Sequence, residues 1–150
     1  MAVTSATRIE IAKEFVRIGY GDVVDHSPFR SLDFLTEELT TAEVQAVLPI
    51  VKEYNAFDGQ MVSNAIEAFK GRMLGWMFGR SGSPYLVAVL APWTHQLEEV
   101  PPRANVGRKF SDEEVAALVA ELRSVMVDKL AADEFGPHGD TDMTFGAWWD

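Results

Sequence analysis

The chain has 150 residues, a net charge of −10, and 47% hydrophobic against 24% charged residues. This composition is ordinary for a soluble globular protein, and the length favours one domain with its own core. The chain has no cysteine, which excludes a disulfide scaffold, thiolate zinc sites and cysteine nucleophiles. The acidic balance disfavours direct binding to nucleic acid, because the protein repels the phosphate backbone.

The charge is unevenly distributed along the chain. Residues 1–69 have a net charge of −6, residues 70–110 of +4 and residues 111–150 of −8. A cationic middle between anionic ends can attract a second copy of the chain or a partner of mixed charge. A solvated surface whose charges are segregated by chance explains the same pattern.

Two features bear on the compartment. The first residues carry charges early and lack an apolar signal core, so we expect a cytoplasmic protein. Residues 73–93 contain one charged side chain, but the sequence GRSGSP lies in their middle and leaves each flank too short to span a bilayer. We therefore expect no contact with a membrane.

Three capping boxes mark helix starts. In each, a Ser or Thr is followed three residues later by Glu, and the two side chains bond each other's backbone N–H groups. The pairs are Thr7 with Glu10, Thr40 with Glu43, and Ser111 with Glu114. Together with the apolar spacing, they predict helices over 8–18, from 40 onward with a break at Pro49, and over 112–132. A short helix is also expected over 31–39.

The central element expected is one long helix over residues 60–79, with Asp58 as its N-cap. Apolar residues recur along one helical face. They are Val62, Ala65, Ile66, Phe69, Met73, Trp76 and Met77. Because Leu74 and Phe78 make the opposite face apolar as well, the pattern indicates a helix buried on all sides, within the fold or an assembly.

Gly71, Gly75 and Gly79 fall on one line of that expected helix. Since each glycine in a helix interior costs about 1 kcal/mol relative to alanine, three on one line favour close approach of another helix. An early end of the helix near residue 77 explains them equally well. With Trp76 and Phe78, these glycines form the first candidate interaction surface.

Residues 84–91 fit either a short helix or a strand. Ser83 followed by Pro84 is typical of a helix start, whereas the β-branched residues that follow favour a strand. We expect a helix, because no second convincing strand is evident to satisfy the backbone of a lone strand. A strand would need an unrecognised hairpin partner or another chain.

The second candidate interaction surface is the acidic, aromatic tail over residues 134–150. Solvated disorder is poor in aromatics, so Phe145, Trp148 and Trp149 are expected to dock on the chain's own core or in a groove of another protein with a basic rim. The tail also contains His138.

Three clusters could bind a divalent metal. They are Asp22, Asp25 and His26; His95, Glu98 and Glu99; and His138, Asp140 and Asp142. Each is explained better as a polar loop, a solvated helix end or a turn, because no zinc-protease or calcium-loop pattern is present. No metal, cofactor or catalytic residue is therefore assigned.

These observations predict a mostly α fold: a single-domain bundle of about five or six helices around the helix 60–79. The function expected is a non-enzymatic interaction or assembly subunit, such as a virion, phage or bacterial complex component, with a protein partner or further copies of itself. One alternative is a small enzyme or ligand-binding protein whose site is built from scattered His, Asp and Glu residues. A second is an acidic nucleic-acid mimic that inhibits another protein.

Overall fold

A computed structural model describes residues 4–20, 34–54, 56–72, 75–81, 83–90, 111–139 and 144–149. In chain order the elements are α1 (Ser5–Tyr20), β1 (Phe34–Leu35), α2 (Thr41–Val47), η1 (Leu48–Ile50), α3 (Gly59–Ala65), η2 (Ile66–Phe69), β2 (Gly75–Ser81), β3 (Ser83–Val89), α4 (Asp112–Arg123), η4 (Ser124–Lys129), β4 (Glu134–Pro137) and β5 (Thr144–Trp148). Short 3₁₀ segments form η1 and η2, and a π-helical segment continues α4 as η4.

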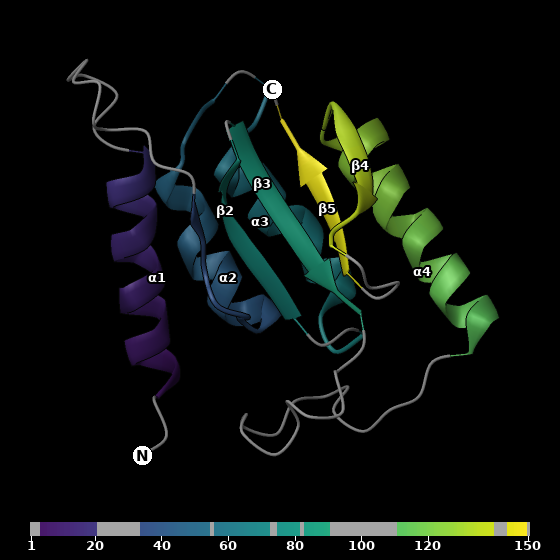
Figure 1. The fold of residues 1–150 in the computed structure, drawn as a ribbon, viewed down its shortest axis with the longest axis horizontal. Helices are drawn as coiled ribbons and strands as arrows, with labels where there is room; N and C mark the ends of the chain where they lie inside the picture. The colour runs from purple at the N-terminus through teal and green to yellow at the C-terminus, as the bar shows by residue number, and fades with distance from the viewer. Residues whose placement is uncertain are drawn as a thin grey trace.

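The strands form one antiparallel sheet in the order β1-β2-β3-β5-β4. Helices α2 and α3 lie behind this sheet, α1 flanks α2 near the β1 edge, and α4 lies beside β4 at the other edge (Figure 1). The expected bundle of five or six helices is therefore wrong. The protein is a mixed α and β structure in which the sheet is the central element.

The long helix expected over 60–79 is replaced by a helix, a turn and a strand. The α-helix ends at Ala65, continues as a 3₁₀ turn to Phe69, and is followed by a turn in which Gly71 has φ of 78°. Residues of β2 then pair with β3 along their whole length, from Gly75 with Val89 to Ser81 with Ser83. The backbone groups of β2 are satisfied by residues 2 to 14 positions further along the chain, which local helical spacing could not reveal.

Within the run over 84–91, residues 84–89 accordingly form a strand rather than the favoured helix. Its partner on one side is β2, the hairpin strand missed in the sequence, and on the other side it is β5 from the C-terminal tail. All of its residues are buried. Because β3 is the middle strand of five, both of its edges are hydrogen-bonded.

The helix expected over 31–39 is not present in the described residues 34–39. This segment is extended, with Leu35 opposite Gly79 in the ladder and Leu39 bridging to Trp76. A side chain at Gly79 would overlap the carbonyl of Phe34, so this glycine serves close approach of a neighbouring strand. It does not serve the approach of a helix.

Most local helix signals are confirmed. Both halves of the capping boxes at Thr40 and Ser111 are formed, and Asp58 accepts the N–H groups of the first turn of α3. The break at Pro49 is also confirmed, since α2 ends two residues before it. The box at Thr7 is wrong, because α1 begins earlier.

Thr4 is the N-cap of α1. The N–H of Thr7 donates to the Thr4 hydroxyl at 3.2 Å, which is the N-cap to N3 relationship. A capping pattern therefore identified the right helix but placed its start three residues late.

The core lies between the sheet and the helices. Its largest fully buried side chains are Trp76, Trp149, Phe57, Phe69, Phe78, Leu39, Leu48, Ile66, Leu86, Leu90, Leu122 and Met126. Both indole N–H groups are satisfied: that of Trp76 donates to the Thr41 hydroxyl at 2.9 Å, and that of Trp149 to the Leu130 carbonyl at 2.8 Å. No helix in the described ranges is long and apolar enough to cross a membrane.

Candidate functional site

The two faces of the sheet have different surroundings. Along β3, Leu86 and Ala88 belong to the core on the helix side, whereas the alternate residues Tyr85 and Val87 point to the opposite face. Within the described ranges, no helix lies over that opposite face, which is turned toward the viewer in Figure 1. We call it the open face because no described helix covers it. The residues of β3 on this face are themselves buried, with Tyr85 at 5% and Val87 at 0% exposure, so the face is accessible toward β5 and β4, at Trp148 and Glu134.

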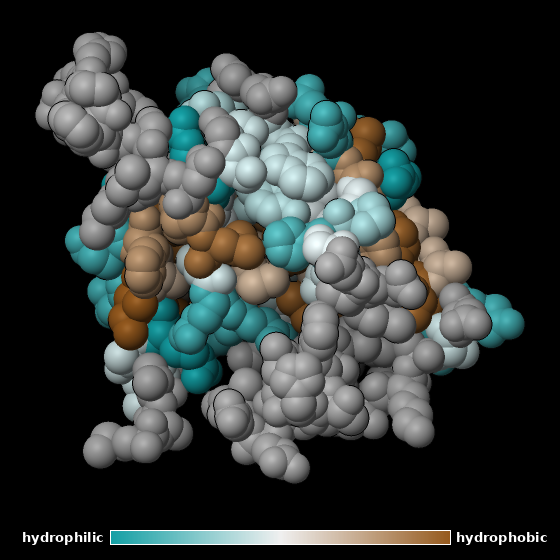
Figure 2. Space-filling view, in the orientation of Figure 1, coloured by the Kyte–Doolittle hydropathy of each residue, from teal (hydrophilic) through white to brown (hydrophobic). Residues whose placement is uncertain are grey.

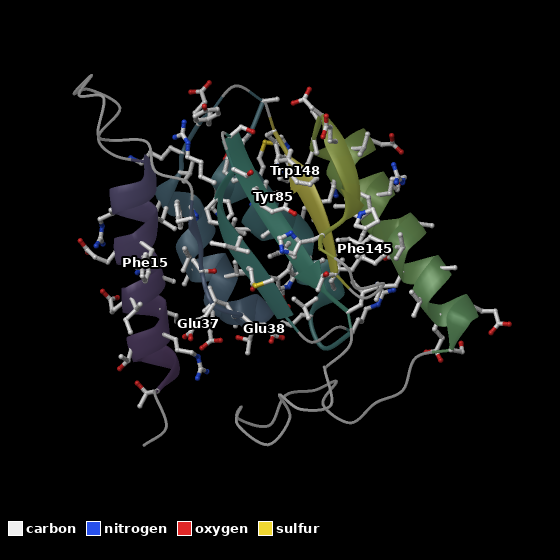
Figure 3. The ribbon with its side chains drawn as sticks, viewed as in Figure 1. Phe15, Glu37, Glu38, Tyr85, Phe145 and Trp148 are labelled. Carbon is white, nitrogen blue, oxygen red and sulfur yellow. The ribbon has the colours of Figure 1, made fainter. Side chains whose placement is uncertain are left out.

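An aromatic pair lies on the open face. Tyr85 on β3 and Trp148 on β5 are directly opposite in the ladder, and their rings stack with centroids 4.1 Å apart and an interplanar angle of 20°. Figure 3 shows the two side chains next to one another on adjacent strands. Tyr85 is 5% exposed, whereas Trp148 is partly exposed. The indole is therefore the member of the pair that a ligand can reach.

The phenol of Tyr85 is hydrogen-bonded to a residue that follows β4, two strands away from β3 in the sheet. Its oxygen lies 2.5 Å from Nδ1 of His138, which follows β4, and the path across β5 passes over Gly146. Burial raises the pKa of Tyr85 to about 12. The phenol is therefore neutral at physiological pH, and its hydrogen bond with Nδ1 holds the ring in place, a structural role rather than that of a nucleophile or a base.

A carboxylate completes a row across three strands. Glu134 on β4 is directly opposite Trp148 on β5, so Tyr85, Trp148 and Glu134 follow one another on the same face. Glu134 is exposed, and among the described residues no basic group lies within ion-pair distance of it. We call these three residues the open-face row.

The residues predicted from the sequence are dispersed by the fold. Trp76 and Phe78 point from β2 into the core, Trp149 is fully buried, and Phe145 stacks on Phe135 on the helix side with centroids 6.0 Å apart. Gly71 lies in a turn, and Gly75 and Gly79 lie in β2. Trp148 is the only one of these aromatic residues that lies on the open face.

Sequence reasoning missed Tyr85, Glu134 and Gly146. A signal for Tyr85 and Gly146 was the β-branched and aromatic content of YLVAV and TFGAW, which favours strands; no such signal marked Glu134. The sequence analysis considered His138 as one member of a possible metal cluster but favoured a turn there; the structure places the imidazole against the Tyr85 ring.

The metal candidates around residues 22–26 and 95–99, and the residues Asp140 and Asp142, lie outside the described residues. Among the residues that are described, no three His, Asp or Glu side chains are grouped so as to hold a metal ion.

A second exposed feature lies on α1. Ile11 is 45% and Phe15 52% exposed, whereas Ala12 and Val16 on the same helix are buried. Figure 2 shows hydrophobic surface over α1 on the viewer's side of the molecule. Ile11 and Phe15 form a short apolar strip on α1, and apolar exposure alone does not define a ligand.

Two long-range ion pairs belong to the scaffold. Arg8 of α1 binds the nearly buried Glu43 of α2 at 2.8 Å, and Arg72 binds Glu121 of α4 through two hydrogen bonds of 2.6 and 2.8 Å. Each joins two elements distant in sequence and has its charges satisfied internally. Neither therefore offers an unpaired group to a ligand.

Comparison with protein-family models, curated proteins and solved structures gives no match to this chain.

Proposed function

We propose that the protein is a non-enzymatic recognition module that binds a basic segment of another protein on the open face of its sheet, around Trp148. The observation that carries this proposal is the open-face row, in which a partly exposed indole lies beside an exposed carboxylate. Tryptophan is enriched in the centres of protein interfaces, because it offers a large apolar area at a low cost in conformational entropy.

Charge selects the kind of partner. The chain has a net charge of −10, so its long-range field attracts cationic segments and increases their rate of encounter. The same field opposes association of two copies through this face and opposes contact with nucleic acid. A basic protein partner therefore agrees better with the site than a homo-oligomer does.

Binding agrees with the site better than catalysis. Among the described residues, the titratable groups around the indole are the carboxylate of Glu134, the phenol of Tyr85, whose pKa is raised, and the imidazole of His138, which is hydrogen-bonded to that phenol. A catalytic base or nucleophile requires a pKa brought toward neutrality. The phenol is shifted in the opposite direction.

The test is a titration of the full chain with a short synthetic peptide that alternates Arg and Lys with Ser, followed by amide NMR shifts. A matched peptide with Glu at every basic position is the control. We expect binding of the basic peptide only, weakened by salt because the attraction is electrostatic, with the largest shifts at residues 134 and 148. Absence of binding, or shifts confined to α1, would overturn the proposal.

Oligomeric state gives an independent check. Light scattering is expected to show a monomer, because the open face repels a second copy. If the protein is a dimer whose interface includes Trp148, the partner bound on the open face is a second copy of the chain and not a different protein. If the chain instead displaces DNA from a DNA-binding protein, and Trp148→Leu leaves this displacement unchanged, the protein is a nucleic-acid mimic and the proposal of a recognition module is wrong.

A further inference from the structure

Resting on the proposed function, we infer that the cationic group recognised is an arginine side chain, seated with its guanidinium plane against the outer face of the Trp148 indole and bound by the carboxylate of Glu134. The inference specifies one side chain of the partner. It follows from the order of strands and from the positions of three residues.

The two faces of the indole are not equivalent. Because β5 lies between β3 and β4, one face of Trp148 is covered by Tyr85 at 4.1 Å, and its other face is turned toward β4. Directly opposite side chains on paired strands have their Cβ atoms about 5 Å apart. Glu134 therefore stands beside the outer indole face, within reach of a group stacked there.

The chemistry of the pair favours arginine over other ligands. A guanidinium is planar, so it can stack on an indole and at the same time present two parallel N–H groups to one carboxylate. An ammonium group offers a point charge without a plane. An anionic ligand is repelled by Glu134, and a purely apolar one would leave this carboxylate partly desolvated without a partner.

Arg123 of α4, which contacts β4, does not occupy this site. The guanidinium of Arg123 on α4 lies 5.1 Å from the ring centroid of Phe135 and donates to that residue's carbonyl at 3.2 Å. Phe135 is the next residue after Glu134 on β4, so its side chain points to the other face of the sheet. Arg123 therefore lies on the helix side.

The row is held in place before any ligand binds. Tyr85 is anchored by His138, and the ladder bonds of β5 to both neighbours fix the backbone of Trp148. The carbonyl of Trp148 also accepts the N–H of Asp133 at 2.7 Å. Within the site, the conformational-entropy cost of binding therefore comes mainly from ordering the Glu134 side chain. A small contact can give measurable binding when this cost is low.

The experiment uses the full chain and two probes, N-acetyl-Gly-Arg-Gly-amide and N-acetyl-Gly-Lys-Gly-amide, with the indole N–H signal of Trp148 followed by NMR. We expect saturable shifts with the arginine probe and binding of the lysine probe weaker by about fivefold or more, since the plane and the second N–H are lost. Trp148→Leu is expected to abolish both responses.

Two carboxylate variants separate the site from general charge. Glu134→Gln should weaken the arginine probe about tenfold, because one charge-assisted pair of hydrogen bonds is lost. Glu113→Gln removes an exposed carboxylate on α4 and should leave the affinity nearly unchanged. Glu134 is exposed, so its variant is expected to fold, and the amide spectrum checks this directly.

The outcomes distinguish this inference from the proposed function. Equal binding of both probes, or an unchanged affinity in Glu134→Gln, overturns the arginine site while the basic-segment proposal stands. Failure of both the arginine probe and the longer basic peptide overturns the two together. Arginine binding whose shifts lie on α1 overturns this location.

Discussion

Gly146 on β5 lies directly beneath the ring of Tyr85, and a Cβ atom at that position would overlap the ring edge and the phenolic oxygen. The missing side chain lets Tyr85 extend across β5 and reach His138. Gly146→Ala should therefore displace the ring and lower the free energy of unfolding by about 1–3 kcal/mol, measured by urea denaturation.

The matched control for this variant is Gly136→Ala. Gly136 is the residue opposite Gly146 in the ladder, and a Cβ atom there would meet nothing within 4 Å. Its effect should be close to zero or stabilising. In a Tyr85→Ala background Gly146→Ala should lose most of its cost, and equal costs in both backgrounds would contradict the steric explanation.

Tyr85 should make stability sensitive to alkaline pH. Burial raises its pKa to about 12 in the folded protein, against about 10 in an unfolded chain. As pH rises above about 10, the unfolded state loses the proton first, so the stability that the neutral phenol contributes below this pH is lost progressively up to about 12.

The variant Tyr85→Phe isolates this effect. Near neutral pH the wild type should be more stable than the variant by about 1 kcal/mol, the contribution of one hydrogen bond. The difference should narrow above about pH 10 and change sign before about pH 12, because the rise in pKa from about 10 to about 12 corresponds to more than about 1 kcal/mol. Urea midpoints of the two proteins measured across this range test the expectation, and a constant difference would refute it.

The bidentate pair between Arg72 and Glu121 ties the turn before β2 to α4. The hydrogen bond from Arg72 holds the pKa of Glu121 below its ordinary value. Because both side chains are more than a third exposed, at 45% and 42%, water and salt screen the pair, and Glu121→Gln should cost only about 0.5 kcal/mol at neutral pH.

The sign of the pH dependence follows from the lowered pKa. The stability contributed by the ion pair is fully present above the pKa that Glu121 has in the unfolded chain. It is lost as the pH falls through the pKa that Glu121 has in the folded protein. Wild type and Glu121→Gln should therefore converge in acid. Glu14→Gln, which breaks a pair within α1, is the control and should cost less, since that pair joins no distant elements.

Ala131 should be a site of simple stabilisation. It has φ of 60°, a left-handed conformation that costs an L-residue about 1–2 kcal/mol, and it follows the end of the helix. The N–H of Ala132 donates to the Met126 carbonyl at 2.8 Å, so the chain folds back on the last π-helical turn at this residue. Ala131→Gly is expected to raise the free energy of unfolding by about 0.5–1 kcal/mol.

The opposite sign is expected in the middle of α4. Ala117 is exposed there, and Ala117→Gly should destabilise by about 1 kcal/mol. Thermal unfolding of the two variants therefore gives shifts in opposite directions. A loss of stability in Ala131→Gly would mean that the helix does not end in this conformation.

The orientation of α1 can be tested by two neighbouring substitutions. Phe15 is 52% exposed and Val16 is fully buried. Val16→Ala should cost about 2 kcal/mol, the loss of two buried carbon groups and the cavity they leave. Phe15→Ser should cost under about 0.5 kcal/mol apart from helix propensity. The reverse order of the two urea midpoints would mean that α1 presents its other face to the core.

Signals of short range could be interpreted correctly from the sequence. The capping boxes at Thr40 and Ser111, the N-cap at Asp58 and the break at Pro49 involve atoms within a few residues, so the sequence alone contains both partners of each interaction. The apolar stripe of α4 was recognised for the same reason.

Patterns that depend on distant partners were misread. Trp76 fits a helical spacing with Phe69, but Trp76 and Phe78 also recur at a period of two in a segment bounded by Gly75 and Gly79. The turn at Gly71 separates the helical pattern from the strand pattern. The sequence by itself determined the starts of α2, α3 and α4, the acidic balance and the aromatic content of the C-terminal residues. The tertiary structure alone decided which of these aromatics reach the surface: Trp149 enters the core, and Trp148 is left between Tyr85 and Glu134. The reason is that pairing across a sheet joins residues far apart in the chain, and which face a strand residue occupies is settled only by its neighbours.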